Sequence, residues 1–207
     1  MSWVDTPDGW RHRIAVHSDL DATDRPGEPA TAIEYRVDAE RTVRLLGETL
    51  SRLHAIELHD DEPAAPLTPA VVAAAATAGL RAGSLVAVRG DAYAHLGQER
   101  LVGVLVEAAP AAADRSGPPV LTHGAPCLAN LRCDLGSAVG FVAWEAAAPA
   151  DRHRDLAVAA RSVAEDLTPV LVPVLFEHYR GPRPDPILLD WWSLAAELLV
   201  ARVPTPG

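Results

Sequence analysis

The 207-residue chain contains no lysine, so all 18 of its basic residues are arginines. They are outnumbered by 28 Asp and Glu residues, and the formal net charge is −10. Aromatic residues make up only 5% of the chain, and the two cysteines are Cys127 and Cys133. An acidic chain does not favour nucleic-acid binding through a basic face. Two cysteines at this spacing form neither a disulfide framework nor a zinc site.

Long apolar runs are missing as well. No stretch reaches the ~18 consecutive apolar residues that indicate a membrane-spanning helix. The N-terminal sequence MSWVDTPDGW has neither the basic region nor the apolar run of a signal peptide. We therefore expect a cytoplasmic protein with no nucleic-acid and no membrane partner. The length corresponds to one domain, or to one domain with an arm.

The apolar pattern predicts a mostly helical protein. Val43, Leu46, Leu50 and Leu53 recur at helical spacing and predict a helix over residues 38–57. The other helices are expected over residues 69–81, 91–109, 155–167, 170–179 and 187–203, with a strand over residues 101–106 as the alternative in the second of these segments. Short strands are expected over residues 13–17, 120–122 and 138–142, and a Pro/Ala/Gly linker over residues 110–119.

Three short motifs follow one another in the second half of the chain. The first is the segment LTHGAPCLAN over residues 121–130. The second is GFVAW over residues 140–144, and the third is DRHRDLA over residues 151–157. The strands expected beside the first two motifs would deliver them as loops.

These motifs resemble, in the same order, those of the aminoglycoside phosphotransferase family of kinase-like phosphotransferases. That family carries His-Gly-Asp, four further residues and Asn, then Gly-Phe-Ile-Asp-Trp, then Asp-Arg-Tyr-x-Asp-Leu-Ala. Here His123, Gly124 and Asn130 match, whereas Ala125 replaces the catalytic Asp and Ala143 replaces the Asp that holds magnesium. The predicted helix over 38–57 also resembles the first helix after the family's hinge.

The resemblance implies a mostly α fold with a small β-element (α+β), equivalent to the C-terminal lobe of a kinase-like phosphotransferase, over residues 38–207. Residues 1–37 are expected to form an N-terminal arm or a hinge remnant. A nucleotide-binding lobe needs several strands of ~5 residues each plus turns, and this segment is too short for them. The nucleotide lobe is therefore expected to be largely absent from this chain.

The substituted positions bear directly on the chemistry. Phosphoryl transfer requires a carboxylate that accepts the proton of the attacking hydroxyl, magnesium ions, and a lysine that holds the nucleotide phosphates. Ala125 cannot accept a proton, Ala143 cannot ligate a hard cation, and the chain has no lysine. We expect no metal, no cofactor and no ATP-dependent kinase activity. An active phosphotransferase would need displaced acids such as Glu145 or Asp134.

The first motif contains two candidate catalytic residues, His123 and Asn130. By resemblance His123 braces the loop; as an alternative it acts as a general base or acid, because imidazole titrates near neutrality. In the third motif, Asp155 matches a family position that anchors the loop.

Arginines near these motifs are candidates for a phosphate site. Arg132, Arg152 and Arg154 could converge with Asn130, since guanidinium groups bind phosphate bidentately. The alternative is that Arg152 and Arg154 pair with neighbouring carboxylates.

Two functional hypotheses follow. In the first, the protein is a lyase that binds a phosphorylated Ser/Thr peptide or small molecule and eliminates phosphate, with thiol addition or cyclisation, in a ribosomal-peptide natural-product pathway. Such a reaction needs an anion site and a base that removes the α-proton. In the second, it is a non-catalytic pseudokinase scaffold that binds a partner kinase or another pathway enzyme. Exposed apolar surface often marks partner sites, and the candidates are Trp3, Trp10, Trp191 and Trp192. For Trp191 and Trp192, which lie in the last predicted helix, the alternative is packing in the core and at its rim.

Overall fold

The computed structural model describes residues 2–5, 11–14, 27–58, 66–85 and 95–199, with residues 2–5, 11–14 and 199 as backbone only. The helices are α1 (Ile33–Val37), α2 (Ala39–His54), α3 (Pro69–Arg81), α4 (Gln98–Arg115), α5 (His153–Asp166), α6 (Val172–His178) and α7 (Pro186–Leu199). A 3₁₀ turn spans Pro169–Leu171. The strands are β1 (Ser2–Asp5), β2 (Arg11–Ile14), β3 (Glu28–Pro29), β4 (Val120–Thr122), β5 (Leu131–Asp134), β6 (Ser137–Phe141) and β7 (Ala148–Ala150). The mostly helical α+β fold expected from the sequence is confirmed.

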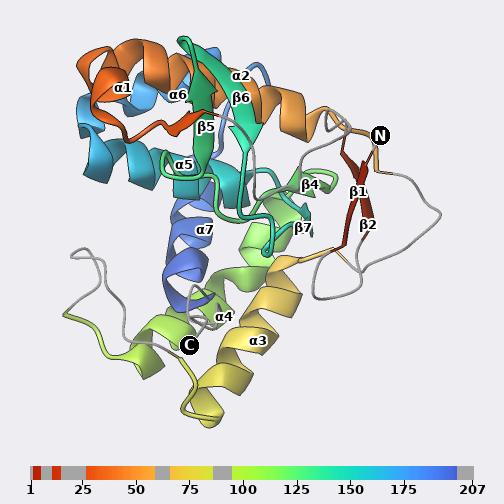
Figure 1. The fold of residues 1–207 in the computed structure, drawn as a ribbon. Coiled ribbons are helices and arrows are strands. Elements are labelled where there is room, and N and C mark those ends of the chain that lie inside the picture. The colour runs from red at the N-terminus through yellow and green to blue at the C-terminus, as the bar shows by residue number, and fades with distance from the viewer. Residues whose placement is uncertain (1, 6–10, 15–26, 59–65, 86–94, 200–207) are drawn as a thin grey trace.

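The helices form two groups that are joined by the contact between α5 and α7. In Figure 1, α1, α2 and α6 lie beside the β5–β6 hairpin at the top, whereas α3 and α4 lie at the bottom. Helix α7 packs against both α5 and α4 and so joins the two groups. No helix among the described residues has the length and apolarity needed to cross a membrane.

The strands form three small antiparallel sheets. One is β3–β5–β6, in which Pro29 faces Arg132 and Arg132 faces Gly140. The second is β4–β7, and the third is the β1–β2 hairpin. Strand β3 and the buried Ala30 connect residues 27–37 to the lobe, so this part of the expected N-terminal arm packs onto it.

Two apolar cores hold the helices together. The first contains the buried face of α2, including Leu46 and Leu50, together with Phe141 of β6 and Leu156 of α5. The second lies between α3, α4 and α7 and includes both Trp191 and Trp192. Because α5 contributes Leu156 to the first core and Ala157 to the second, this helix fixes the two halves relative to each other.

The two tryptophans of α7 do not form a partner surface. Trp191 and Trp192 are 4% and 2% exposed, and their rings meet edge to face with centroids 5.0 Å apart. The Nε1 of Trp191 donates a hydrogen bond to the carbonyl of Leu105 on α4. Of the two interpretations given for this pair, packing in the core is confirmed, and a partner surface at these two residues is excluded. The side chains of Trp3 and Trp10 lie outside the described residues.

The expected linker over residues 110–119 is also wrong in its first half, because α4 continues to Arg115. Pro110 lies inside this helix, where proline removes a hydrogen bond and crowds the preceding turn. Alanines surround it, and alanine has the highest helix propensity. Ala109 and Ala112 are buried in the second core, so packing offsets the cost of the proline.

Two helical glycines differ in the space around them, and this difference gives a matched test of the packing. Gly47 of α2 faces α6 so closely that an added Cβ would lie 2.8 Å from the carbonyl oxygen of Leu175. Gly103 of α4 is exposed and has no heavy atom within 4 Å of the same position. We expect Gly47→Ala to lower the free energy of unfolding by about 1–3 kcal/mol through overpacking. Gly103→Ala should raise it by about 0.5–1 kcal/mol. Urea denaturation measures both, and equal effects would contradict the packing of α2 on α6.

Candidate functional site

The loop between β4 and β5 is held by one buried carboxylate, that of Asp155 on α5. The backbone N–H of His123 donates to its Oδ2 at 2.7 Å, and the backbone N–H of Gly124 donates to its Oδ1 at 2.8 Å. The Nε2 of His54, at the end of α2, lies 3.2 Å from Oδ2. Asp155 therefore fixes the first two residues of the HGA sequence to two helices.

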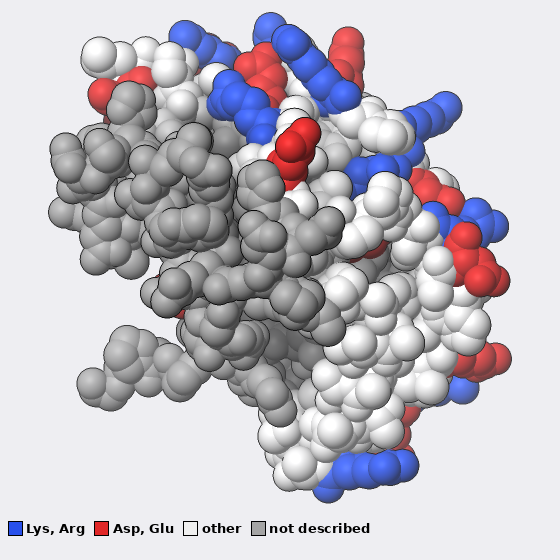
Figure 2. Space-filling model, turned by 90° about the vertical axis from the view of Figure 1, so that its right-hand side faces the viewer, with Lys and Arg blue, Asp and Glu red and all other residues white. Residues whose placement is uncertain are grey.

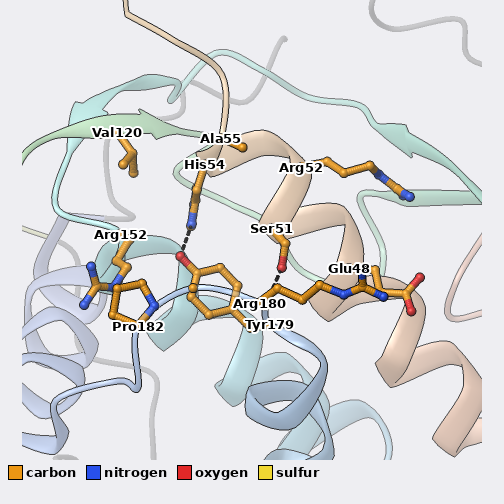
Figure 3. Close-up of a pocket in the computed structure, with 11 residues that line it drawn as sticks. Glu48, Ser51, Arg52, His54, Ala55, Val120, Arg152, Tyr179, Arg180 and Pro182 are labelled. Atoms are coloured by element: carbon orange, nitrogen blue, oxygen red, sulfur yellow. Dashed lines mark hydrogen bonds between the residues drawn. The ribbon is translucent and has the colours of Figure 1, made fainter.

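These contacts set the charge of Asp155. Burial raises the pKa of its carboxyl. The hydrogen bond and charge of His54, together with the nearby Arg154 guanidinium, lower the pKa by more than burial raises it, so the net pKa shift is downward. An ionised Asp155 only accepts hydrogen bonds, so His54 donates through Nε2. The Nδ1 of His54 is hydrogen-bonded to the hydroxyl of Tyr179 at 2.9 Å (Figure 3).

The imidazole of His123 is enclosed rather than exposed. Its Nε2 donates to the carbonyl of Val142 at 2.8 Å, and its Nδ1 accepts from the backbone N–H of Ala125 at 3.2 Å. Phe141 and Trp144 contact the ring. Burial lowers the pKa of His123, which keeps it neutral. With both nitrogens used inside the protein, the geometry supports the bracing role and provides no free base at this residue.

Gly124 packs closely against Arg154 and the backbone of Ala146. Gly124 has a φ of +86°, and an added Cβ would lie 2.5 Å from the carbonyl oxygen of Ala146 and 2.6 Å from Nη2 of Arg154. Arg154 donates to Thr122 Oγ1 and to the carbonyl of Ala146, both at 2.8 Å. Its terminal nitrogens thus join β4 to the segment before β7, and they do not face a phosphate site.

At Ala125, where the sequence resemblance predicts a catalytic Asp in the family, this chain contributes only its backbone. Its carbonyl oxygen accepts a hydrogen bond from Nδ2 of Asn130 at 2.9 Å. The carbonyl of Asn130 accepts in turn from the N–H of Val142 at 3.0 Å. Asn130 therefore closes the loop on itself and links it to β6, while the methyl group of Ala125 occupies the position where a proton acceptor would lie.

At the position of the family's metal-holding Asp, Ala143 has a left-handed backbone with φ of +62°. A residue with a Cβ pays about 1–2 kcal/mol for this conformation, whereas Gly, Asn and Asp tolerate it better. The backbone at this position therefore has a conformation that suits Asp better than Ala.

The donor set does not fit a magnesium ion. Magnesium requires oxygen ligands in a near-octahedral arrangement, and the two positions that would supply carboxylates carry methyl groups. Among the described residues, no cluster of three or more His, Cys, Asp or Glu side chains is placed to hold a metal. Glu145 and Asp134, the displaced acids considered above, are both exposed.

The three candidate phosphate-binding arginines do not converge. Arg132 lies on β5 between Pro29 and Gly140, whereas Arg152 lines a pocket beside His54 and Tyr179. Arg152 and Arg154 are two residues apart at the start of α5, and residues at this spacing on a helix do not share a face. The arginines therefore belong to three different environments.

Neither Arg152 nor Arg154 forms an ion pair with the neighbouring acids among the described residues. Asp151 instead accepts hydrogen bonds from Nδ1 of His153 at 2.6 Å and from the N–H of Gly117 at 3.0 Å. Burial raises the pKa of Asp151, but its hydrogen bonds to His153 and Gly117 make the net shift downward.

With the site described, comparisons with known proteins identify the family. A profile of the phosphotransferase enzyme family matches residues 10–191, so the chain belongs to this family. No curated protein sequence matches the chain significantly.

Several solved structures share the fold. An aminoglycoside-3'-phosphotransferase of type VIII is 25% identical, with a TM-score of 0.67 over 84% of this chain and 66% of that chain. A Streptomyces rimosus aminoglycoside phosphotransferase, solved with ADP and streptomycin, is 17% identical, with a TM-score of 0.69 over 83% of this chain and 67% of that chain. A Plasmodium vivax ethanolamine kinase is 20% identical, with a TM-score of 0.56 over 84% of this chain and 53% of that chain. The chain thus spans about two thirds of the first two proteins and about half of the third.

Asp155 gives the first test of the loop geometry. Replacing it with Asn removes the charge that the N–H groups of His123 and Gly124 share, and we expect a loss of roughly 3 kcal/mol in unfolding free energy at pH 7. The control is Asp190→Asn on the exposed face of α7, which should change stability by less than about 0.5 kcal/mol. Chemical denaturation compares the two variants.

The same pair tests the pKa of Asp155. Folding lowers this pKa, so the carboxylate contributes stability above its unfolded pKa of about 3.9, and the contribution is lost as pH falls through the folded pKa. The stability difference between wild type and Asp155→Asn should be constant near neutrality and shrink below about pH 4. A difference independent of pH would show that the charge of Asp155 does not stabilise the loop.

Ala143 gives a test of the retained backbone. Ala143→Gly relieves the left-handed conformation and should raise the free energy of unfolding by roughly 0.5–1 kcal/mol. Ala129, which is exposed in the same region and has no positive φ, serves as the control, and Ala129→Gly should lower stability by about 0.5 kcal/mol. A destabilising effect of Ala143→Gly in thermal unfolding would show that the left-handed conformation is not present in solution.

Proposed function

We propose that this protein is a phosphotransferase-family member that has lost phosphoryl transfer and acts by binding, as a pseudokinase-like module for a phosphorylated ligand or a partner enzyme. One observation carries the proposal. The loop 123–130 keeps its hydrogen-bonded framework, while methyl groups occupy the positions of the proton acceptor and the metal ligand.

The retained framework favours a binding role over simple decay of an enzyme. Asp155, His54 and Tyr179 form a connected set of buried or half-buried polar groups. Each of these groups would be costly to leave unpaired. A chain that keeps them while losing both acids preserves the shape of the lobe and discards its chemistry.

Phosphate elimination, the other hypothesis, needs a base near the α-carbon of a bound phosphorylated residue. His123 was the candidate, and its two ring nitrogens are occupied by Val142 and Ala125. Asn130 cannot act as a base, and its amide donates to the loop. The binding role therefore accounts for the geometry with fewer requirements than a lyase in a ribosomal-peptide pathway.

The proposal predicts no phosphoryl transfer and no thermal stabilisation by magnesium ATP. Ligands that bind only the folded state raise its apparent stability, so a thermal-shift series with Mg²⁺ and with Mg-ATP measures binding directly. The double variant Ala125→Asp/Ala143→Asp is the matched comparison. Since the loop backbone is retained, the added carboxylates should restore a shift with Mg²⁺. Phosphate transfer or a clear Mg-ATP shift in the wild type would contradict the proposal.

A further inference from the structure

The third motif contains a residue that the site described above does not use. His153 stands where the family's motif has Tyr, so this chain carries an imidazole in place of a phenol. The residue is the first of α5, and it is 1% exposed. A phenol titrates at about pH 10, whereas an imidazole usually changes its charge between about pH 5 and pH 8. The substitution therefore places a group that can gain a proton inside the lobe.

Both ring nitrogens of His153 have partners, and these partners come from different connections of the fold. Nδ1 lies 2.6 Å from Oδ1 of Asp151, which directly follows β7. Nε2 lies 2.9 Å from the backbone nitrogen of Asp185, which directly precedes α7. Asp151 also accepts a hydrogen bond from the N–H of Gly117, between α4 and β4. His153 thus lies where three connections between elements meet.

The two partners determine the state of the ring. Burial raises the pKa of the Asp151 carboxyl, and its hydrogen bonds to His153 and Gly117 lower this pKa by more. The carboxylate is therefore ionised near neutrality and only accepts hydrogen bonds. The backbone N–H of Asp185 only donates. The ring satisfies both partners at once only when it is neutral, with its hydrogen on Nδ1 and a lone pair on Nε2.

A proton on Nε2 breaks one of these two contacts. A charged imidazole has an N–H on each nitrogen, so Nε2–H would face the N–H of Asp185, and two donors would meet. The contact with Asp151 persists, because the carboxylate attracts the charged ring. His153 is enclosed, whereas Asp185 is half-exposed and can turn to water. Asp185 is therefore the side of the contact that moves.

The other charged groups of this junction keep their charge while an imidazole titrates. Oδ1 of Asp185 accepts from the N–H of Ile187 at 2.8 Å, and its Oδ2 accepts from Arg115 of α4 at 3.0 Å. These two contacts lower the pKa of Asp185. Burial raises the pKa of the nearby Tyr179 to about 12, and a guanidinium stays charged. His153 is thus the group at this junction whose charge changes near neutrality.

The junction is buried, in contrast to most of the charge on this chain. Asp151 is 5% exposed, and Asp155 is the other buried carboxylate among the described residues. On the face shown in Figure 2, arginines and acidic side chains are interspersed along the upper and right-hand edges of the surface. Salt and water screen charges at the surface, but they screen a buried pair much less. A proton gained by His153 therefore acts strongly on its immediate partners.

The segment between α6 and α7 is held at both ends by histidines. At its start, the Tyr179 hydroxyl is hydrogen-bonded to His54, and at its end the N–H of Asp185 is bonded to His153. Residues 179–182 line a pocket of about 510 Å³ together with the C-terminal end of α2 (Figure 3). Loss of the contact to Asp185 frees one end of the segment that forms this wall.

We propose that His153 is a pH-sensitive switch in which the neutral ring links the start of α5 to the start of α7 and the charged ring releases Asp185. The signal is a proton, and the element that responds is the connection between α6 and α7. The switch goes beyond the binding role proposed above, and either can hold without the other.

NMR on the 207-residue chain, titrated from about pH 8 to about pH 5, tests the switch. The ring ¹⁵N shifts of His153 report its tautomer and its charge, and the amide of Asp185 reports the hydrogen bond. The informative variant is His153→Gln, because a Gln side chain offers an acceptor to the Asp185 N–H and does not titrate. The control is His95→Gln, which replaces an exposed histidine. Circular dichroism establishes that each variant is folded.

We expect the neutral ring of His153 to carry its hydrogen on Nδ1. As the pH falls, the amide shift of Asp185 should change with the same midpoint as the ring. The protection of this amide against hydrogen exchange should fall about tenfold, as the loss of one hydrogen bond implies. His153→Gln should show neither change at Asp185, and His95→Gln should behave like the wild type.

Four results would overturn the inference. The first three come from the wild type alone: a neutral His153 with its hydrogen on Nε2, a ring that does not titrate while the protein is folded, and an Asp185 amide whose midpoint differs from that of the ring. The fourth is an equal pH dependence of the Asp185 amide in the wild type and in folded His153→Gln. If His153→Gln does not fold, the wild-type titration decides.

Discussion

The buried carboxylate of Asp155 is the constraint on which the rest of the site depends. It ties the backbone of His123 and Gly124 to α5, and through His54 it ties both to α2. A buried charge is stable only when it is fully paired, so these partners hold one another in place. The positions of Ala125, Asn130 and Ala143 follow from this arrangement, because the loop leads from Gly124 to Asn130 and the carbonyl of Asn130 meets Val142.

The site thus separates two properties that coexist in an active phosphotransferase. The hydrogen bonds that shape the loop belong mostly to backbone groups and to residues outside the catalytic positions. The chemistry belongs to two side chains that here are alanines. The hydrogen bonds that His123, Gly124 and Asn130 donate within the site use no side-chain atom of Ala125 or Ala143. Ala143 has a left-handed backbone conformation, which Asp tolerates better than Ala does.

Sequence reasoning predicted the elements whose signals are local. The spacing of Val43, Leu46, Leu50 and Leu53 predicted α2, and Thr68 before Pro69 marks the start of α3, where the Thr68 side chain accepts from the N–H of Val71. The family and the fold also followed from three ordered motifs. Strand β7 was missed because it is short and pairs with β4, which is distant in the sequence. Strand β5 was missed although its partner β6 follows it across a tight turn, because its four residues give only a weak pattern. The contact between Asp155 and His54 was missed because the two residues are 101 positions apart in the sequence. The contact between His54 and Tyr179 was missed because it depends on the packing of α6 on α2. The arginines could be named but not placed, since the directions of Arg152 and Arg154 depend on where α5 begins and that of Arg132 depends on the pairing of β5.

Hydrogen exchange at the backbone amides of His123 and Gly124, followed by NMR, tests the central claim most directly. Both amides lie in a loop, yet each donates to a buried carboxylate. The account predicts protection comparable to that of the central amides of α2 and α5, because their exchange would require opening of the core. Exchange as fast as that of exposed loop amides would contradict it, since the loop would then not be held in place once the two acids are gone.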